Sequence, residues 1–212
     1  MQQKDLQFVN DVLRPWESLN AFLVERYAFQ PNLSDITNQV RGLSVSIKHQ
    51  VDLIADEQTN LTIKQHQEAA NRERQAARIV SDLADSLKHG KLKDQSRQCD
   101  LKVVAHFECN EEEMFRFLRN VPEVTHASLG QHDFLVLSLD AMRYWVRARN
   151  LQVDVGALKV QEAENTFFPT AHLAFNEAYC IQANSVRIKF FARDNQGVLV
   201  PYNPQNVNIS IN

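Results

Sequence analysis

The stretch that decides the fold is residues 34–90, which read SDITNQVRGLSVSIKHQVDLIADEQTNLTIKQHQEAANRERQAARIVSDLADSLKHG. Ser34 suits a helix N-cap, because its hydroxyl can accept a hydrogen bond from a free amide of the first turn. Gly90 can adopt the left-handed conformation that follows a helix C-terminus. Between them the pattern predicts one long helix over residues 34–89, roughly 80 Å in length. Apolar residues recur there at the three-to-four spacing of one helical face, namely Ile36, Val40, Leu43, Ile47, Val51, Ile54, Leu61, Ala76, Val80, Leu83 and Leu87.

Two features speak against a single unbroken helix. Gly42 costs about 1 kcal/mol relative to alanine inside a helix, and residues 43–47 alternate with period two, as a strand would. The alternative is a break near Asn60 that folds this stretch into a compact bundle.

Residues 1–33 predict a shorter first arm. Pro15 is expected to kink this helix or to begin a second one, and a turn at residues 30–32 favours an antiparallel hairpin with the long helix. Such an arm covers only the first half of the long helix, so the rest of the apolar face needs another cover. We therefore predict a homo-oligomer of coiled-coil type with an interface at Ala76, Val80, Leu83 and Leu87. The apolar face of the first arm comprises Leu6, Val9, Leu13, Trp16, Leu19, Leu23 and Tyr27.

The C-terminal half has a different composition, since nine of the twelve phenylalanines lie beyond residue 100. After a linker at residues 91–100, the pattern predicts strand 101–109, helix 110–121 capped by Asn110, strands 124–129 and 134–139, helix 141–149 capped by Asp140, and strand 151–160. This β-α-β-β-α-β order predicts a ferredoxin-like α+β domain over residues 101–164. The predicted class is α+β, with a helical hairpin over residues 1–90.

Residues 165–212 predict a small antiparallel β module. The expected strands are 178–183, 186–193, 198–200 and 207–211, and the residues 194–197 form a turn.

One local resemblance bears on residues 101–160. The sequence Val121-Pro-Glu-Val124, followed by Gly130-Gln-His-Asp133 and an apolar stretch, resembles the effector-binding module of Lrp/AsnC-type regulators. That resemblance implies a dimerising module for small molecules such as amino acids, with Gly130 and Asp133 beside a ligand loop. Residues 1–95 depart from the family, because they do not read as a helix-turn-helix domain, so the resemblance supports the local fold more than the function.

The sequence carries none of the strong catalytic or nucleotide-binding motifs, so no cofactor or metal is predicted. Two nuclease arrangements remain as alternatives. Arg119 and His126 have the loose spacing of HEPN ribonucleases, and a metal-dependent nuclease would need carboxylates to hold Mg²⁺ beside a lysine. The residues for that second arrangement are Asp133, Asp154, Lys159 and Glu162.

A row of cations suggests contact with phosphate groups. Arg143 and Arg147 are one helical turn apart and share a face. Alternating cations around Phe191 can hold a phosphate backbone while the ring stacks on a base. The candidate contacts are Arg143, Arg147, Arg187, Lys189 and Arg193.

Composition sets the functional hypotheses. With 212 residues, 44% hydrophobic, 23% charged and a net charge of −3, the chain is typical of a soluble protein. Its three scattered cysteines and the lack of an apolar N-terminal segment predict free thiols and a cytoplasmic location without membrane insertion. We predict a non-enzymatic assembly protein that binds itself through the long helix and a protein partner through its C-terminal domain. The alternatives are a small-molecule-sensing regulatory domain and a nucleic-acid-binding protein or nuclease.

Overall fold

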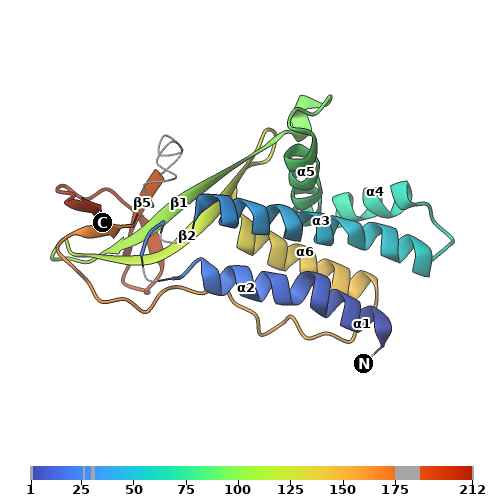
Figure 1. Cartoon of the computed structure of the whole chain (residues 1–212), viewed down its shortest axis with the longest axis horizontal. Coiled ribbons are helices and arrows are strands. Elements are labelled where there is room, and N and C mark those ends of the chain that lie inside the picture. Colours follow the sequence, from blue (N-terminus) through green and yellow to red (C-terminus); the bar gives the residue numbers. More distant parts are fainter. Residues whose placement is uncertain (1, 26, 30–31, 175–186, 212) are drawn as a thin grey trace. The chain divides into compact units, whose positions relative to one another are not determined.

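The computed structural model describes residues 2–25, 27–29, 32–174 and 187–211, and it combines helices with strands, as the predicted α+β class requires (Figure 1). The chain divides into two compact units, neither of which is a continuous segment. The helical unit comprises Met1–Leu19, Asn38–Leu101 and Glu123–Val160, and the strand-rich unit comprises Asn20–Thr37, Lys102–Pro122 and Gln161–Asn212.

The N-terminal arm is helical, as predicted, but a π-helical turn interrupts it. Helix α1 (Gln3–Phe8) is followed by η1 (Val9–Leu13) and α2 (Arg14–Phe22). The wider π turn lies directly before Pro15, which has no amide hydrogen to donate. Asp5, Phe8 and Val12 are buried in this arm, whereas the predicted Leu6 is exposed and the predicted Val9 and Leu13 are half-buried.

The single long helix was the wrong prediction, and the alternative break near Asn60 is observed. Three helices replace it: α3 (Leu33–Glu57), α4 (Ile63–Glu73) and α5 (Gln75–His89). Thr62 begins α4, because its hydroxyl accepts a hydrogen bond from the Gln65 amide. A second break falls at Arg74, whose extended backbone separates α4 from α5. Gly42, in contrast, lies inside α3 without interrupting it.

The returning apolar face is covered within the chain. Ala76, Val80 and Leu83 are 6%, 0% and 0% exposed, and Leu87 is half-buried. Helix α5 packs against α4 and α6, and the helices α2, α3 and α6 run side by side in Figure 1. The prediction of an oligomer interface at these residues rested on an apolar stripe without a cover. Because the chain itself covers this stripe, that reason no longer applies.

Helix α6 (Phe134–Ala148) corrects the prediction of a strand at residues 134–139. Asp133, and not Asp140, is its N-cap, because the Asp133 carboxylate accepts a hydrogen bond from the Leu135 amide at 2.9 Å. This helix is buried around most of its circumference, so its apolar run resembled a buried strand. The Trp16 indole donates to the Leu135 carbonyl and the Ser138 hydroxyl, at 3.3 and 3.0 Å, and fastens α2 to α6.

The main sheet has the strand order β3-β2-β1-β5-β6. Strand β1 (Cys99–Cys109) agrees with its prediction, but β2 (Phe115–His126) replaces the predicted helix 110–121. The Asn110 side chain accepts hydrogen bonds from the Glu112 and Met114 amides, and Glu113 has a positive φ of 54°, so these residues form a turn and not a helix start. Strand β3 (Gly130–Asp133) pairs antiparallel with β2.

The ferredoxin-like order is consequently not observed in residues 101–164, all of which the structure describes. Residues 151–160 also contain no strand in this described segment. Strand β5 (Arg187–Arg193) pairs parallel with β1 and antiparallel with β6 (Leu199–Tyr202). Strands β4 (Ala171–Leu173) and β7 (Ile209–Ile211) form a separate parallel pair. The predicted strand 178–183 and Cys180 lie outside the described residues.

Candidate functional site

The candidate site is an aromatic pocket in the strand-rich unit, with a volume of about 350 Å³. Ring-bearing residues from several segments line it, together with a carboxylate, an amide and two hydroxyls. We call this site the aromatic pocket. Its lining residues are Tyr27, Phe107, Phe115, Phe117, Glu164, Asn165, Thr166, Phe168, Thr170 and His172.

The floor of the pocket comes from β1 and β2. Phe115 and Phe117 are two positions apart on β2 and therefore share a face of the sheet. Phe107 of β1 packs edge-on against Phe117, with ring centroids 5.7 Å apart. Phe115 packs against Phe190 of β5 at 5.4 Å. Phe107, Phe115 and Phe117 are buried, and these rings form an apolar base held together by edge-on and tilted aromatic contacts.

The segment 163–168 forms one wall, because its backbone pairs with the first half of β2. The amide of Phe115 donates to the Phe168 carbonyl at 2.7 Å and the reverse bond measures 2.8 Å, while the Ala163 amide donates to the Leu118 carbonyl. The Asn165 side chain adds a bond to the Phe117 carbonyl. Phe168 is thereby held at the mouth with 43% of its surface exposed.

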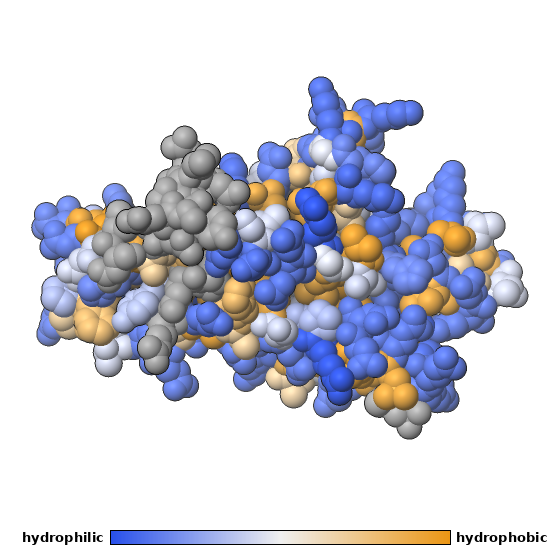
Figure 2. All heavy atoms as spheres, viewed as in Figure 1, coloured by the Kyte–Doolittle hydropathy of each residue, from blue (hydrophilic) through white to orange (hydrophobic). Residues whose placement is uncertain are grey.

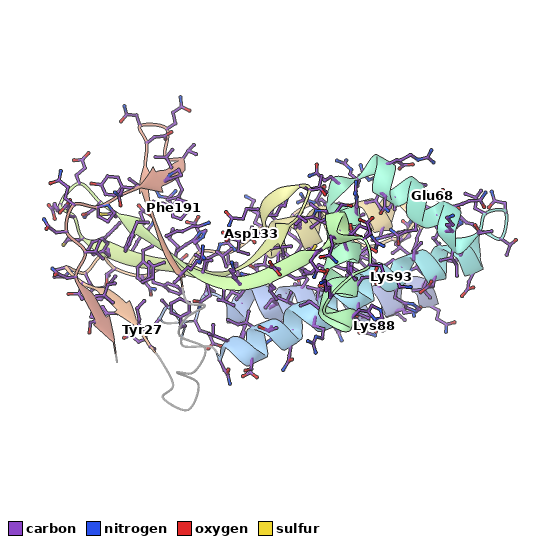
Figure 3. The ribbon with its side chains drawn as sticks, turned by 90° about the horizontal axis from the view of Figure 1, so that it is seen from above. Tyr27, Glu68, Lys88, Lys93, Asp133 and Phe191 are labelled. Carbon is purple, nitrogen blue, oxygen red and sulfur yellow. The ribbon has the colours of Figure 1, made fainter. Side chains whose placement is uncertain are left out.

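Tyr27 and His172 form a further part of the lining. Ala28 bridges Leu173 of β4, and the Ala174 amide donates to the Ala28 carbonyl at 2.9 Å. His172 stands between two rings, with centroids 6.4 Å from Tyr27 and 5.4 Å from Phe168, both in edge-on geometry. Figure 3 shows Tyr27 beside these short strands. Three half-exposed or exposed rings therefore surround the opening.

The segment that carries Tyr27 contains a residue with a strained backbone. Phe29 has a φ of 62°, which is unfavourable for a bulky side chain. The Asn120 side chain accepts a hydrogen bond from the Phe29 amide at 2.9 Å, and the Asn120 amide donates to the Leu23 carbonyl at 2.8 Å. Asn120 is fully buried in β2. The surrounding structure thus imposes this conformation next to the pocket, where strain of this kind is often associated with function.

The pocket opens beside a second hollow that is rich in carboxylates. This acidic hollow has a volume of about 720 Å³ and shares Glu164 and Asn165 with the aromatic pocket. Glu162 accepts a hydrogen bond from Arg193 at 2.9 Å, whereas Glu25 and Glu164 form no ion pair with any described residue. The mouth is therefore negatively charged. The hollow is lined by Val24, Glu25, Gln161, Glu162, Ala163, Glu164 and Asn165.

The predicted row of cations is divided between the two units. Arg143 and Arg147 lie on α6 and line one hollow of the helical unit. Arg187, Lys189 and Arg193 lie on β5 in the strand-rich unit. Of these, Arg193 is neutralised by Glu108 and Glu162, at 3.2 and 2.9 Å. Arg143 and Arg147 thus share a face of α6, and Arg187, Lys189 and Arg193 alternate along β5 and share a face of that strand.

The other predicted site residues have local structural partners. Asp133 caps α6, and Gly130, with a φ of 85°, is the first residue of β3 and directly follows a turn. The Asp154 carboxylate accepts the Gly156 amide in a turn, and Glu162 pairs with Arg193. Among the described residues, no three histidine, cysteine or acidic side chains form a group that could hold a metal. A ligand loop at Gly130 and Asp133 stays a prediction.

A buried charged network in the helical unit was missed from the sequence. Asp82 is 2% exposed, and its carboxylate lies 3.1 Å from His126 Nε2 and 2.7 Å from the Arg97 guanidinium. Arg97 also reaches Asp85 at 3.0 Å, and Asp85 pairs with Lys48. The only signal in the sequence was an acidic residue between apolar positions of α5. Every member of this network has partners, so it is a structural feature and not an open site.

Cys99 lies beside this network and predicts a pH dependence of stability. Burial, with a further contribution from the Asp82 charge, raises the pKa of the Cys99 thiol from about 9 to about 12. The unfolded chain releases this proton above about pH 9 while the native state retains it. Stability should therefore fall as the pH rises from about 9 to about 12, by at most about 1.4 kcal/mol per pH unit. Urea unfolding at pH 8.5 and 10.5 measures this effect. Between these pH values, the free energy of unfolding should fall by less for Cys99→Ala than for the wild type, and an equal fall would contradict this role of Cys99.

Comparison with known proteins gives no relative: no family model, curated protein or solved structure matches this chain. In the part of the chain that the structure describes, no helix has the length and apolar character needed to cross a membrane. On the face drawn in Figure 2, hydrophobic residues are interspersed with hydrophilic ones. Self-association and the docking of a protein partner stay predictions.

Proposed function

We propose that the strand-rich unit is a binding module for a small organic cation with an aromatic or aliphatic body. This is the small-molecule-binding alternative, placed at a different site from the loop at Gly130 and Asp133. The observation that carries it is the aromatic pocket itself, whose rings adjoin carboxylates that have no ion-pair partner among the described residues.

The shape of the pocket supports a small ligand. Its volume of about 350 Å³ is at the lower end of the range for small-molecule sites. The buried rings of Phe107, Phe115 and Phe117 offer an apolar surface, and Thr166 and Thr170 supply hydroxyls that can orient a bound group. A mostly apolar cavity with a few polar groups is typical of ligand sites.

The charge of the pocket supports a cation. The face of an aromatic ring attracts a positive charge, with a stabilisation of about 0.5–2 kcal/mol per contact, depending on how far the pair is shielded from water. Tyr27 and Phe168 expose rings at the mouth, and Glu164 lies between the aromatic pocket and the acidic hollow. An anion would meet these carboxylates and be repelled. A neutral ligand would lose the attraction of both the rings and the charges.

The test compares two ligands of nearly identical shape. Benzyltrimethylammonium carries the positive charge, and neopentylbenzene is its neutral isostere. Calorimetric titration of the full chain should show binding of the cation, and its affinity should exceed that of the isostere by about tenfold, equivalent to 1.4 kcal/mol. Equal affinities, or no heat with the cation, would refute the proposal.

Two variants locate the site, and one serves as a control. Phe168→Leu and Glu164→Gln should each weaken binding of the cation by about three- to tenfold, because each removes one attraction from an exposed position. Tyr202→Leu is the matched control, since Tyr202 is 39% exposed in the same unit but does not line the pocket. A control that weakens binding as much as Phe168→Leu would place the ligand elsewhere.

A further inference from the structure

The helical unit contains a separate hollow, which supports an independent inference. It has a volume of about 410 Å³, and we call it the arginine hollow. Three guanidinium groups line it, against a single carboxylate from Asp140. Its lining residues are Arg74, Asp140, Arg143, Val146, Arg147, Val155 and Gly156.

Two of the three arginines come from α6 and the third from the junction between α4 and α5. Arg143 and Arg147 are four residues apart on α6, so their side chains share one face. Arg74 reaches the same hollow from the junction between α4 and α5. Arg147 also suits the last turn of α6, where a cation stabilises the helix end. That role does not explain Arg143, one turn earlier, or Arg74 between α4 and α5.

The guanidinium groups differ in how strongly they are already held. Arg143 donates to the Leu158 carbonyl at 3.3 Å, which leaves its other donors available while it fixes the group in place. Arg147 is exposed and pairs with no described residue. Arg74 and Asp140 are 4.0 Å apart with side chains 42% and 41% exposed, and such a long, hydrated ion pair contributes little. An anion with several oxygens can therefore replace Asp140 as the partner of Arg74.

The backbone at Arg74 does not by itself favour an anion. Arg74 is the N-cap of the 15-residue helix α5, whose first turn contains no acidic residue. The same residue is the C-cap of α4, so the negative end of α4 offsets the positive end of α5. Glu73, the residue before Arg74, does not line the hollow. The attraction for an anion therefore comes from the three guanidinium groups.

We propose that the arginine hollow binds the phosphoryl group of a small phosphorylated molecule. Arginine binds phosphate through two parallel hydrogen bonds, so Arg143 and Arg147 provide paired donors from one helix face. Val146 and Val155 offer an apolar wall for the remainder of such a ligand. This site is independent of the cation site proposed for the strand-rich unit.

The test uses inorganic pyrophosphate as the probe. Calorimetric titration of the full chain should show one binding site, and Arg147→Gln should weaken the affinity at least fivefold. Arg41→Gln is the matched control, because Arg41 is also exposed in the helical unit but lies on α3, away from the hollow. Because Arg147 is exposed and contributes only its charge at the end of α6, the thermal midpoint of the unliganded variant should lie within a few degrees of that of the wild type.

The outcomes separate this site from nonspecific charge and from nucleic acid. No binding of pyrophosphate, or equal losses for Arg41→Gln and Arg147→Gln, would overturn the proposal. A fluorescent single-stranded oligonucleotide provides the second arm. The site is supported if pyrophosphate displaces the oligonucleotide and if Arg147→Gln weakens the affinity for both. Tight oligonucleotide binding that pyrophosphate does not displace identifies a nucleic-acid surface instead, and the small-ligand proposal then fails.

Discussion

Replacing Asp82 by alanine is expected to lower the free energy of unfolding by about 3–5 kcal/mol, because it leaves buried polar partners without their acceptor. The Ser128 amide donates to His126 Nδ1 at 3.1 Å, so the other ring nitrogen carries the hydrogen that faces Asp82. His126 is 1% exposed, so water cannot replace Asp82 as the acceptor of its hydrogen bond. Arg97 would lose its shortest contact, at 2.7 Å. Urea unfolding followed by tryptophan fluorescence measures this loss.

Two further substitutions separate the contributions of this network. Asp82→Asn keeps an oxygen acceptor, so its free energy of unfolding should fall by less than that of the alanine variant. Asp85→Ala should cost only about 1 kcal/mol, because the Asp85 side chain is 20% exposed and water can hydrate the partners it releases. If Asp82→Ala and Asp85→Ala destabilise the protein equally, burial is not what makes Asp82 important.

The existence of the helices was predictable from the sequence, but their boundaries were not. The three-to-four spacing identified the buried positions of α3 and α5 correctly, since Ile36, Val40 and Leu83 are all fully buried. It did not reveal the break between α3 and α4, where Thr62 caps a new helix. The same spacing also failed ahead of Pro15, where Asp5, Phe8 and Val12 are buried in place of three of the predicted apolar residues.

The sheet was harder to predict because its strand β2 is buried on both faces. In β2, nine of the twelve residues are buried, so the period of two that distinguishes a strand is weak. Leu118 and Val121, three positions apart and both buried, matched a helical spacing equally well. The prediction of α6 failed for a related reason. This helix is buried on most sides, so its apolar residues do not show the 3.6-residue period of a helix with one buried face. Asp133 was the overlooked signal for its start.

The candidate site was only half visible in the sequence. The excess of phenylalanine after residue 100 correctly located an aromatic core in β1, β2 and β5. Tyr27 and His172 could not be added to it, because they meet only through the bridge between Ala28 and Leu173. For the arginine hollow, the spacing of Arg143 and Arg147 was informative, but Arg74 joins them only once the helix breaks at that residue.

Replacing Arg149 by alanine should be comparably damaging, with an expected loss of about 3–5 kcal/mol in the free energy of unfolding. Arg149 is 2% exposed at the end of α6, and its guanidinium binds both Glu57 and Gln50 of α3. Lys4 donates to the Arg149 carbonyl at 2.9 Å, so the same residue also holds α1. Truncation leaves a cavity and removes the partner of two polar side chains.

A matched set of variants decides whether the ion pair or the volume of Arg149 matters. Arg149→Met keeps most of the apolar stem, so it should lose less than Arg149→Ala if packing dominates. A double-mutant cycle with Glu57→Gln isolates the pairwise contribution, which we expect to be about 1–3 kcal/mol because the guanidinium is shielded from water while Glu57 is 28% exposed. Urea unfolding of the four proteins supplies the cycle. A coupling near zero, together with a loss below about 1 kcal/mol for Arg149→Ala, would show that water replaces this residue without cost and that α3 and α6 are held together by their apolar contacts alone.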